Sequence, residues 1–429
     1  MEKKSLHLGV LLFGCGHHQA AWKMPNSSIE RLGDITYHQS LAQLAEKGLF
    51  DIVFFADNQS FSGNNTEAFP VSWFDPLINL TAISQVTKHV GLVPTVSSTF
   101  SNPYTVARQL LSLDHITGGR VGWNLVTSMT DLEAQNHSMK KLPPHEIRYK
   151  KAHEFAKVVN GLFETWQLDS FKPNREAGTI LDISMIHPIN HKGDNFEVKG
   201  PMSTPGSPQG KPVALQAGAS DYGVDLANTY AECVYSVSWN LAQARQFKEK
   251  LVAKESNRTQ PLKIFPGLVT YVGKTREEAW AKKEALDDLL AVETGLNQLS
   301  FFIQQDCATW DLNEKVPSLP PLEEFTGPKG RYQTILEIIQ DKNPTVKELL
   351  GYLSAGGGHF TSIGTPEDIV DDMERWLEAG VADGFNLMPP TLPGSLDDFV
   401  TLVVPELQKR GLFRKVYQDE TLRQRLGLI

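Results

Sequence analysis

Small polar side chains stand at the carboxyl ends of several short apolar runs in this chain. Asp57, Thr95 and Asn124 are three of them. A carboxylate, a small hydroxyl and an amide brought together can hydrogen-bond the edge of a planar heterocycle and leave space for its ring. Simpler roles are open to each residue, because an Asp after a strand can cap a turn and Thr or Asn can bond neighbouring backbone groups.

A turn of small residues, which includes Ala217, Gly218 and Ser220, joins a fifth apolar run to a stretch of helical period. Such a turn exposes the N–H groups of the first helical turn, and the Ser220 hydroxyl can add a donor. These donors and the helix dipole together favour a phosphate. The alternative is that Ser220 is an ordinary helix N-cap.

His145, Arg148 and Tyr149 open the longest predicted helix. Because residues three and four apart share a helix face, His145 and Tyr149 can converge on one target with Arg148 beside them. The alternative is a solvated polar helix start.

Four further histidines have the chemistry for acid or base roles, and the sequence does not rank them: His17, His18, His137 and His359. The chain has no G-x-S-x-G, Walker A or H-E-x-x-H motif. Its glycine-rich segment at Gly14–Gly16 lacks the third glycine of a dinucleotide loop. We expect no metal site, and no side chain is singled out as a catalytic base.

Eight short apolar runs, each followed by a stretch of helical period, predict the elements that position these side chains. The predicted strands are Leu6–Phe13, Asp51–Ala56, Val90–Val96, Arg120–Val126, Val213–Gln216, Glu232–Val237, Ile264–Val272 and Gly384–Met388. The predicted helices are Ile35–Lys47, Asp75–Thr87, Tyr104–His115, His145–Trp166, Ser220–Tyr230, Leu241–Lys254, Arg276–Val292 and Leu396–Glu406. Alternation of this kind implies parallel strands with right-handed crossovers. Eight units favour an α/β fold of the closed (β/α)8 TIM barrel type, because open doubly wound sheets usually have five or six strands.

Two stretches interrupt the repeat, at about residues 167–211 and 295–358. The first is rich in Gly and Pro and predicts a small hairpin over Ile186–Val198. The second predicts helices over Arg331–Gln340 and Thr345–Ser354. We interpret both as insertions at the carboxyl ends of barrel strands within a single domain that spans residues 1–429.

Composition excludes several classes of protein. With 41 Lys and Arg against 50 Asp and Glu, the net charge of −9 argues against a broad nucleic-acid surface. The three cysteines are widely spaced and odd in number, which favours a reducing compartment without disulfides. The first apolar run is too short to span a membrane. A cytoplasmic enzyme without a membrane partner is therefore expected.

The segment Ser112–Ser128, with the sequence SLDHITGGRVGWNLVTS, closely resembles the bacterial-luciferase-like flavin monooxygenases. The resemblance is strongest to the group of nitrilotriacetate monooxygenase component A, dibenzothiophene-sulfone monooxygenase and long-chain alkane monooxygenase. Further matching segments are Ala45–Asp51, Gln216–Ser220 and Val404–Phe413. The likeness runs almost from end to end of the chain.

This resemblance implies a barrel that binds FMN at the carboxyl ends of its strands. Asp57 and Thr95 would then contact the isoalloxazine ring, and Asn124 and Ser128 would line the same pocket. The remaining implied contacts, to the ribityl chain and phosphate, come from His145, Tyr149, Ser220 and the backbone of Ala217 and Gly218.

The implied reaction is two-component monooxygenation. A separate NAD(P)H:FMN reductase supplies FMNH2, which reacts with O2 to a C4a-peroxyflavin and passes one oxygen atom to a small organosulfur or amine-containing substrate. The family also implies a homodimer or homotetramer. Met129 and the segment Asp306–Leu312 depart from relatives, so substrate contacts do not transfer. Two alternatives remain: a non-catalytic FMN-binding or sequestering protein, and a barrel reductase that uses a deazaflavin.

Overall fold

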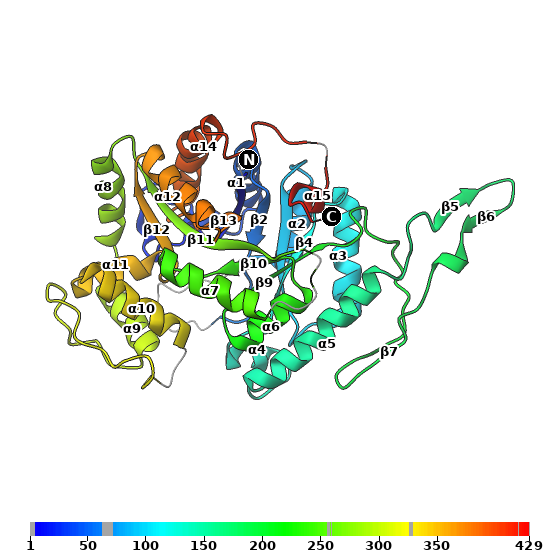
Figure 1. Cartoon of the computed structure of the whole chain (residues 1–429), viewed down its shortest axis with the longest axis horizontal. Coiled ribbons are helices and arrows are strands. Elements are labelled where there is room, and N and C mark those ends of the chain that lie inside the picture. The colour runs from blue at the N-terminus through cyan, green and yellow to red at the C-terminus, as the bar shows by residue number, and fades with distance from the viewer. Residues whose placement is uncertain are drawn as a thin grey trace. The chain divides into compact units, whose positions relative to one another are not determined.

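The computed structural model describes residues 5–61, 72–254, 258, 260–325, 329–418 and 420–428. Parallel strands alternate with helices along the chain in a (β/α)8 barrel fold (Figure 1), which confirms the predicted fold class. The chain divides into two compact units. Unit 1 holds residues 1–50, 235–253 and 263–415, and unit 2 holds residues 51–234, 254–262 and 416–429.

Unit 2 carries four of the parallel strands in the order β2-β3-β4-β9. Their bounds are β2 Ile52–Phe55, β3 Gly91–Ser97, β4 Gly122–Val126 and β9 Val213–Ala217. Its helices are α2 Pro76–Ser84, α3 Pro103–Thr117, α4 Asp131–Asn136, α5 His145–Phe163, α6 Asp221–Tyr230 and α15 Leu422–Arg425. The register places Thr95 of β3 beside Asn124 of β4. Two polar strand ends therefore stand next to each other.

Unit 1 carries four parallel strands in the order β1-β13-β11-β12. Their bounds are β1 His7–Leu11, β11 Lys263–Val272, β12 Phe360–Gly364 and β13 Gly384–Leu387. The short strand β10, Cys233–Ser236, crosses the boundary between the two units along the chain. The helices of unit 1 are α1 Ile35–Lys47, α7 Leu241–Ala253, α8 Arg276–Asp287, α9 Val292–Ile303, α10 Lys329–Lys342, α11 Val346–Ser354, α12 Pro366–Glu378, α13 Gly394–Asp398 and α14 Val404–Lys409, with a π-helical turn at Phe399–Val403 between the last two.

Glycine and side-chain caps define several helix ends. Helix α3 ends at Gly118, whose φ of +66° lies in the left-handed region that glycine adopts without strain. Helix α12 begins in a reciprocal capping box between Thr365 and Asp368. Thr275 caps α8 through the Glu278 N–H, whereas the Glu278 carboxylate accepts from the N–H of Lys274.

The structure corrects three details of the sequence prediction. Strand β12 was missed, because Phe360–Gly364 mixes polar and apolar residues and pairs only with the carboxyl half of β11. The predicted helix Arg276–Val292 ends early, as α8 at Asp287, and Val292 begins a second helix, α9, before the expected start of the insertion. The excursion at 167–211 holds the predicted hairpin as the antiparallel pair β7 His191–Lys192 and β8 Glu197–Val198. It also holds a second antiparallel pair, β5 Phe171–Asn174 and β6 Thr179–Leu181.

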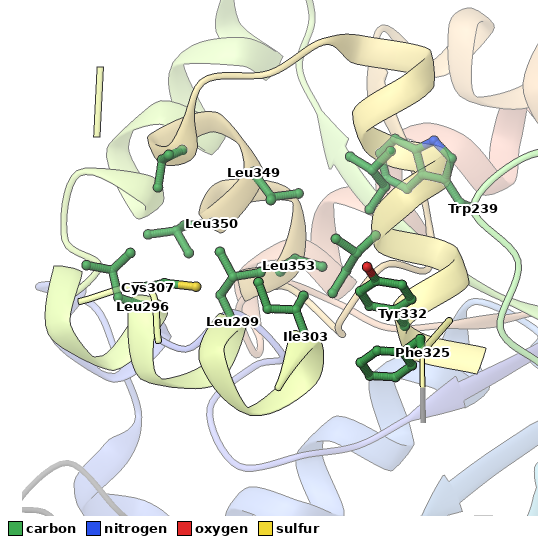
Figure 2. Close-up of a cluster of buried hydrophobic side chains, with 13 residues drawn as sticks. Trp239, Leu296, Leu299, Ile303, Cys307, Phe325, Tyr332, Leu349, Leu350 and Leu353 are labelled. Carbon is green, nitrogen blue, oxygen red and sulfur yellow. The ribbon is translucent and has the colours of Figure 1, made fainter. Parts of the chain in front are cut away.

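The insertion of unit 1 is built around its own hydrophobic cluster. Figure 2 shows side chains of α9, α10 and α11 pointing toward one another, with Trp239 from the segment after β10 among them. Tyr332 stacks on Phe325 with ring centroids 3.8 Å apart. Cys307 is fully buried here, and the three cysteines are free thiols.

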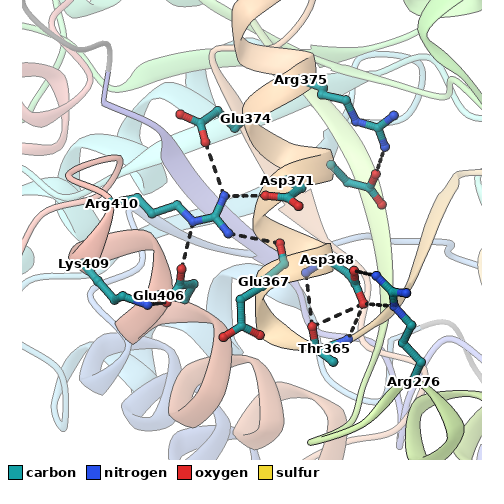
Figure 3. A network of polar contacts seen from close by, with 11 residues as sticks. Arg276, Thr365, Glu367, Asp368, Asp371, Glu374, Arg375, Glu406, Lys409 and Arg410 are labelled. Atoms are coloured by element: carbon teal, nitrogen blue, oxygen red, sulfur yellow. Dashed lines mark hydrogen bonds and ion pairs between the residues drawn. The ribbon is translucent and has the colours of Figure 1, made fainter.

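Charged side chains tie α12 to α14 and α8 on the outer face of unit 1 (Figure 3). The Arg410 guanidinium lies 2.8 Å from Glu406, 2.5 Å from Asp371 and 3.4 Å from Glu374. Arg276 of α8 pairs with Asp368 at 2.6 Å. No described helix is long and apolar enough to cross a bilayer.

Candidate functional site

The predicted strand-end residues of unit 2 form a buried polar row. The Asn124 amide donates to the Thr95 hydroxyl at 3.1 Å, as the register of β3 and β4 requires. Asn124 is only 2% exposed, and its Oδ1 has no hydrogen-bond partner among the described residues. Two residues after Thr95, at the end of β3, the Ser97 hydroxyl lies 2.9 Å from the Ser128 hydroxyl. Since buried polar atoms are normally satisfied, the unpartnered Asn124 oxygen could accept a hydrogen bond from a ligand.

Asp57 stands after β2 in a half-buried position. Burial raises the pKa of its carboxyl group above the ordinary value, and the charges of Asp75 and Glu133 add to this effect. The Gln59 amide donates to Asp57 at 3.2 Å and opposes the shift. The Gln59 oxygen lies 2.6 Å from Nε2 of His137.

His137 is held flat against Phe100, with ring centroids 4.3 Å apart and 7° between the planes. Asp57, Gln59 and His137 therefore form one hydrogen-bonded chain, in which Gln59 fixes both ionisable groups. The sequence left His137 unranked among four histidines and missed Gln59. Its position two residues after Asp57 is the signal that could have identified it.

The second part of the site lies where α5 and α6 begin. The rings of His145, Tyr149 and Tyr222 pack together, with the first two 4.7 Å apart. Tyr149 is only 7% exposed. A Cβ added to Gly218 would lie 3.3 Å from the Tyr149 hydroxyl, so this oxygen sits directly above the turn after β9.

Ser220 is the N-cap of α6 and accepts from the Gly223 N–H at 3.1 Å. The capping role was the alternative interpretation, and it uses the Gly223 N–H of the first helical turn. Asp221, the first helical residue, is exposed and lies 3.9 Å from the Lys254 ammonium.

Arg148 bridges the two parts of the site. Its Nη1 donates to the Ser128 carbonyl at 2.8 Å, and its Nε is buried without a partner among the described residues. Burial lowers the pKa of this guanidinium and, with the charge of Arg148, that of His145. Two further buried atoms in this part of unit 2 have no described partner, the Trp123 indole nitrogen and the Gln216 oxygen. All nine predicted site residues thus belong to unit 2.

A model of the family described as Luciferase-like monooxygenase matches residues 11–383. The chain belongs to this family. N-acetyl-S-(2-succino)cysteine monooxygenase of Bacillus subtilis is 38% identical over 100% of this chain and 97% of its own. Nitrilotriacetate monooxygenase component A of Aminobacter aminovorans is 38% identical over 99% of this chain and 97% of its own. The crystal structure of DmoA from Hyphomicrobium sulfonivorans has a TM-score of 0.85 and 32% identity, covering 99% of this chain and 92% of that one.

These similarities confirm the predicted family and the predicted barrel. The chain is an enzyme, a flavin-dependent monooxygenase. Nitrilotriacetate monooxygenase is also a member of the narrower group to which the sequence pointed. In the described part of this luciferase-like monooxygenase, no three His, Cys, Asp or Glu residues are grouped to hold a metal ion.

The histidines of unit 1 separate into two kinds in this monooxygenase. His18 accepts from the Ala20 N–H through Nδ1, and its Nε2 lies 2.7 Å from the Ser354 hydroxyl and 3.1 Å from Asp287. Both ring nitrogens are therefore occupied by contacts that join the loop after β1 to α11 and α8. His18 is a structural residue.

His17 and His359 are different, because each keeps bonding capacity. Burial lowers the pKa of His17 to about 4, and its Nε2 lies 3.1 Å from the Leu11 carbonyl. The His17 ring stacks on Phe13 at 5.3 Å. Burial, Arg331 and His17 hold the pKa of His359 well below its usual range, and its Nδ1 has no described partner. Both imidazoles are neutral at pH 7.

Proposed function

We propose that this chain is the oxygenase component of a two-component system. A separate NAD(P)H:FMN reductase supplies FMNH2, and one oxygen atom of O2 enters a small organosulfur or amine-containing compound. The observation that carries the proposal is the surface around Tyr149 and Gly218, where a hydroxyl, a guanidinium and a helix start converge. The words "component A" in one relative's name support a second component here.

The phosphate of FMN fits this convergence. The Tyr149 hydroxyl, the first turn of α6 after Ser220 and the buried Arg148 Nε supply donors and positive charge. A side chain larger than glycine at position 218 would fill the space below the Tyr149 hydroxyl. His145 and the backbone of Ala217 and Gly218 would border the ribityl chain.

The isoalloxazine ring fits the polar row on β2, β3 and β4. Asn124 Oδ1 can accept from a ring N–H, because its own amide is held by Thr95. Ser128 and Asp57 would complete the edge of the ring. A free buried acceptor next to a small hydroxyl suits a flat heterocycle with its own N–H groups.

Reduced flavin, when bound, supplies the two electrons that activate O2. The chain's own residues position the flavin and shield it from water, since Thr95, Asn124 and Tyr149 are each more than nine-tenths buried. The Asp57–Gln59–His137 chain can hold a proton beside the ring, because burial favours the protonated form of Asp57. We further propose a cytoplasmic homo-oligomer that consists of a single barrel domain with insertions at about 167–211 and 295–358.

The test is anaerobic loading of the full chain with FMNH2, followed by rapid mixing with oxygenated buffer. We expect a flavin absorbance transient that outlives the oxidation of free FMNH2, and a faster decay when substrate is added. Tight binding of FMNH2 without such a transient would favour a flavin-sequestering protein. Preference for a deazaflavin over FMNH2 in the same titration would favour the barrel reductase.

A further inference from the structure

One arginine of unit 1 has no acidic partner. Arg331 of α10 donates through Nη1 to the Gly357 carbonyl and lies 5.9 Å over the Phe302 ring. These are its only contacts of this kind with the described residues, and no described carboxylate forms an ion pair with it. The remaining N–H groups of the guanidinium are available to a ligand.

Several other arginines of the chain are compensated. Arg410 and Arg423 each pair with carboxylates, and the buried Arg120 is saturated by the carbonyls and a hydroxyl around it. Arg331 is partly buried in the insertion and has one carbonyl contact but no carboxylate partner among the described residues. A partly buried guanidinium without a carboxylate partner attracts an anion, because the interaction is screened less there than in bulk water.

The neighbour His359 adds a polar group without adding charge. His359 lies on the side of the glycine loop, where a Cβ on Gly356 would be 3.5 Å from its ring. Its Nδ1 is buried without a described partner, and both His359 and His17 are neutral because of burial. The group therefore offers one positive charge and one unpartnered imidazole nitrogen, because the single N–H of neutral His17 is used on the Leu11 carbonyl.

The loop that carries these groups requires glycine. Gly356, Gly357 and Gly358 all have positive φ, at +89°, +66° and +90°. A Cβ on Gly357 would lie 2.8 Å from Arg331 Nη1, and one on Gly356 would lie 2.9 Å from the Met388 methyl carbon. The glycines thus let the backbone approach the guanidinium closely and fix its direction.

We propose that Arg331, with His359 beside it, binds a carboxylate group of the substrate. This inference rests on the proposed function and narrows its substrate class to organosulfur or amine compounds that are also carboxylic acids. Arginine suits this role, because its planar fork matches the two oxygens of a carboxylate. His17 follows the carboxyl end of β1, the end of the strands at which barrel enzymes bind their substrates.

The test compares thiodiglycolate, a thioether with two carboxylates, with its uncharged dimethyl ester. Binding of each to the full chain is measured by calorimetry, with and without anaerobic FMNH2. The variants are Arg331→Gln and Arg331→Lys, with Arg245→Gln on the exposed side of α7 as the matched control. Arg331→Lys covers the case in which the glutamine variant does not fold.

We expect wild type to prefer the acid over the ester, and Arg331→Gln to lose about 10- to 100-fold in affinity for the acid only. Arg331→Lys should retain part of the preference, and Arg245→Gln all of it. Equal binding of acid and ester to wild type, or unchanged acid binding in Arg331→Gln and Arg331→Lys, overturns the proposal. The proposal is also overturned if an Arg331 variant binds FMN more weakly but riboflavin normally. The Arg331 guanidinium would then contact the flavin phosphate.

The two proposals fail separately in these measurements. Acid preference that depends on Arg331 without binding of FMNH2 refutes the proposed function and leaves the anion site in place. Normal binding of FMNH2 without acid preference refutes the anion site and leaves the oxygenase assignment in place.

Discussion

Replacing Tyr149 with Phe removes a single hydroxyl from the proposed phosphate site. The ring is only 7% exposed and packs against His145 and Tyr222, so the phenyl group should keep its position and the fold should be preserved. A hydrogen bond to a charged group contributes about 1.5–3 kcal/mol. At 1.4 kcal/mol per factor of ten, FMN binding should weaken by about 10- to 100-fold.

The assay is an anaerobic titration of wild type and Tyr149→Phe with FMNH2 and with reduced riboflavin, which lacks the phosphate. Only the FMNH2 affinity should fall, and Tyr104→Phe on α3 should bind both as wild type does. The reasoning is refuted if Tyr149→Phe binds FMNH2 normally, or if it weakens both flavins equally. In the second case the hydroxyl would contact the ring or the ribityl chain.

Three further predictions concern the chain from Asp57, the outer charge network and the hairpin of unit 2. Gln59→Leu removes the hydrogen bond that lowers the pKa of Asp57, so the acidic limb of the pH profile of kcat/KM should move to higher pH. If the acidic limb does not move, Asp57 is not the group whose ionisation causes it. Arg410→Met leaves three carboxylates without their common cation and should cost about 1–3 kcal/mol of unfolding free energy by thermal denaturation, whereas Arg375→Met at an exposed single pair should cost less than about 0.5 kcal/mol. Burial opposes ionisation of Glu154, but bonds from His191 and Asn195 lower its pKa from 4.5 to about 2. Since this folded-state pKa is depressed, the stabilisation exists above pH 4.5 and is lost as pH falls toward 2. Glu154→Gln should therefore cost about 2 kcal/mol of stability at pH 7. In hydrogen exchange of the β7–β8 hairpin, the difference between Glu154→Gln and wild type should vanish in acid.

The alternation of strands and helices could be predicted because each element carries a local signal. Helix α1 matches its prediction residue for residue, and α6 begins after the cap expected at Ser220. Strand β12 could not be predicted in this way. Its sequence, FTSIG, has neither a continuous apolar run nor a clean alternation, and it is defined by its pairing with the carboxyl half of β11.

The candidate site was predictable as a set of residues but not as a set of contacts. Asp57, Asn124 and Tyr149 were found from their positions at strand ends and helix starts. The roles of Gln59 and Arg331 depend on residues 78 and 26 positions away, at His137 and Gly357, and no short-range pattern encodes such pairings. The same reason explains why four histidines looked alike in sequence, although packing makes His18 structural and leaves His359 with bonding capacity.

The hydrophobic cluster of α9, α10 and α11 has a consequence for how such enzymes diversify. Among the described members of this cluster, Trp239 alone comes from outside residues 290–353. The hydrophobic side chains of this segment pack mainly against one another and share one indole, that of Trp239, with the rest of the chain. Such a segment can accumulate substitutions, or be replaced by another helical insertion, while the barrel strands keep their sequence. The barrel sequence would then stay constant while the helical segment varies. Trp239 would be the residue that packs against both and therefore constrains both.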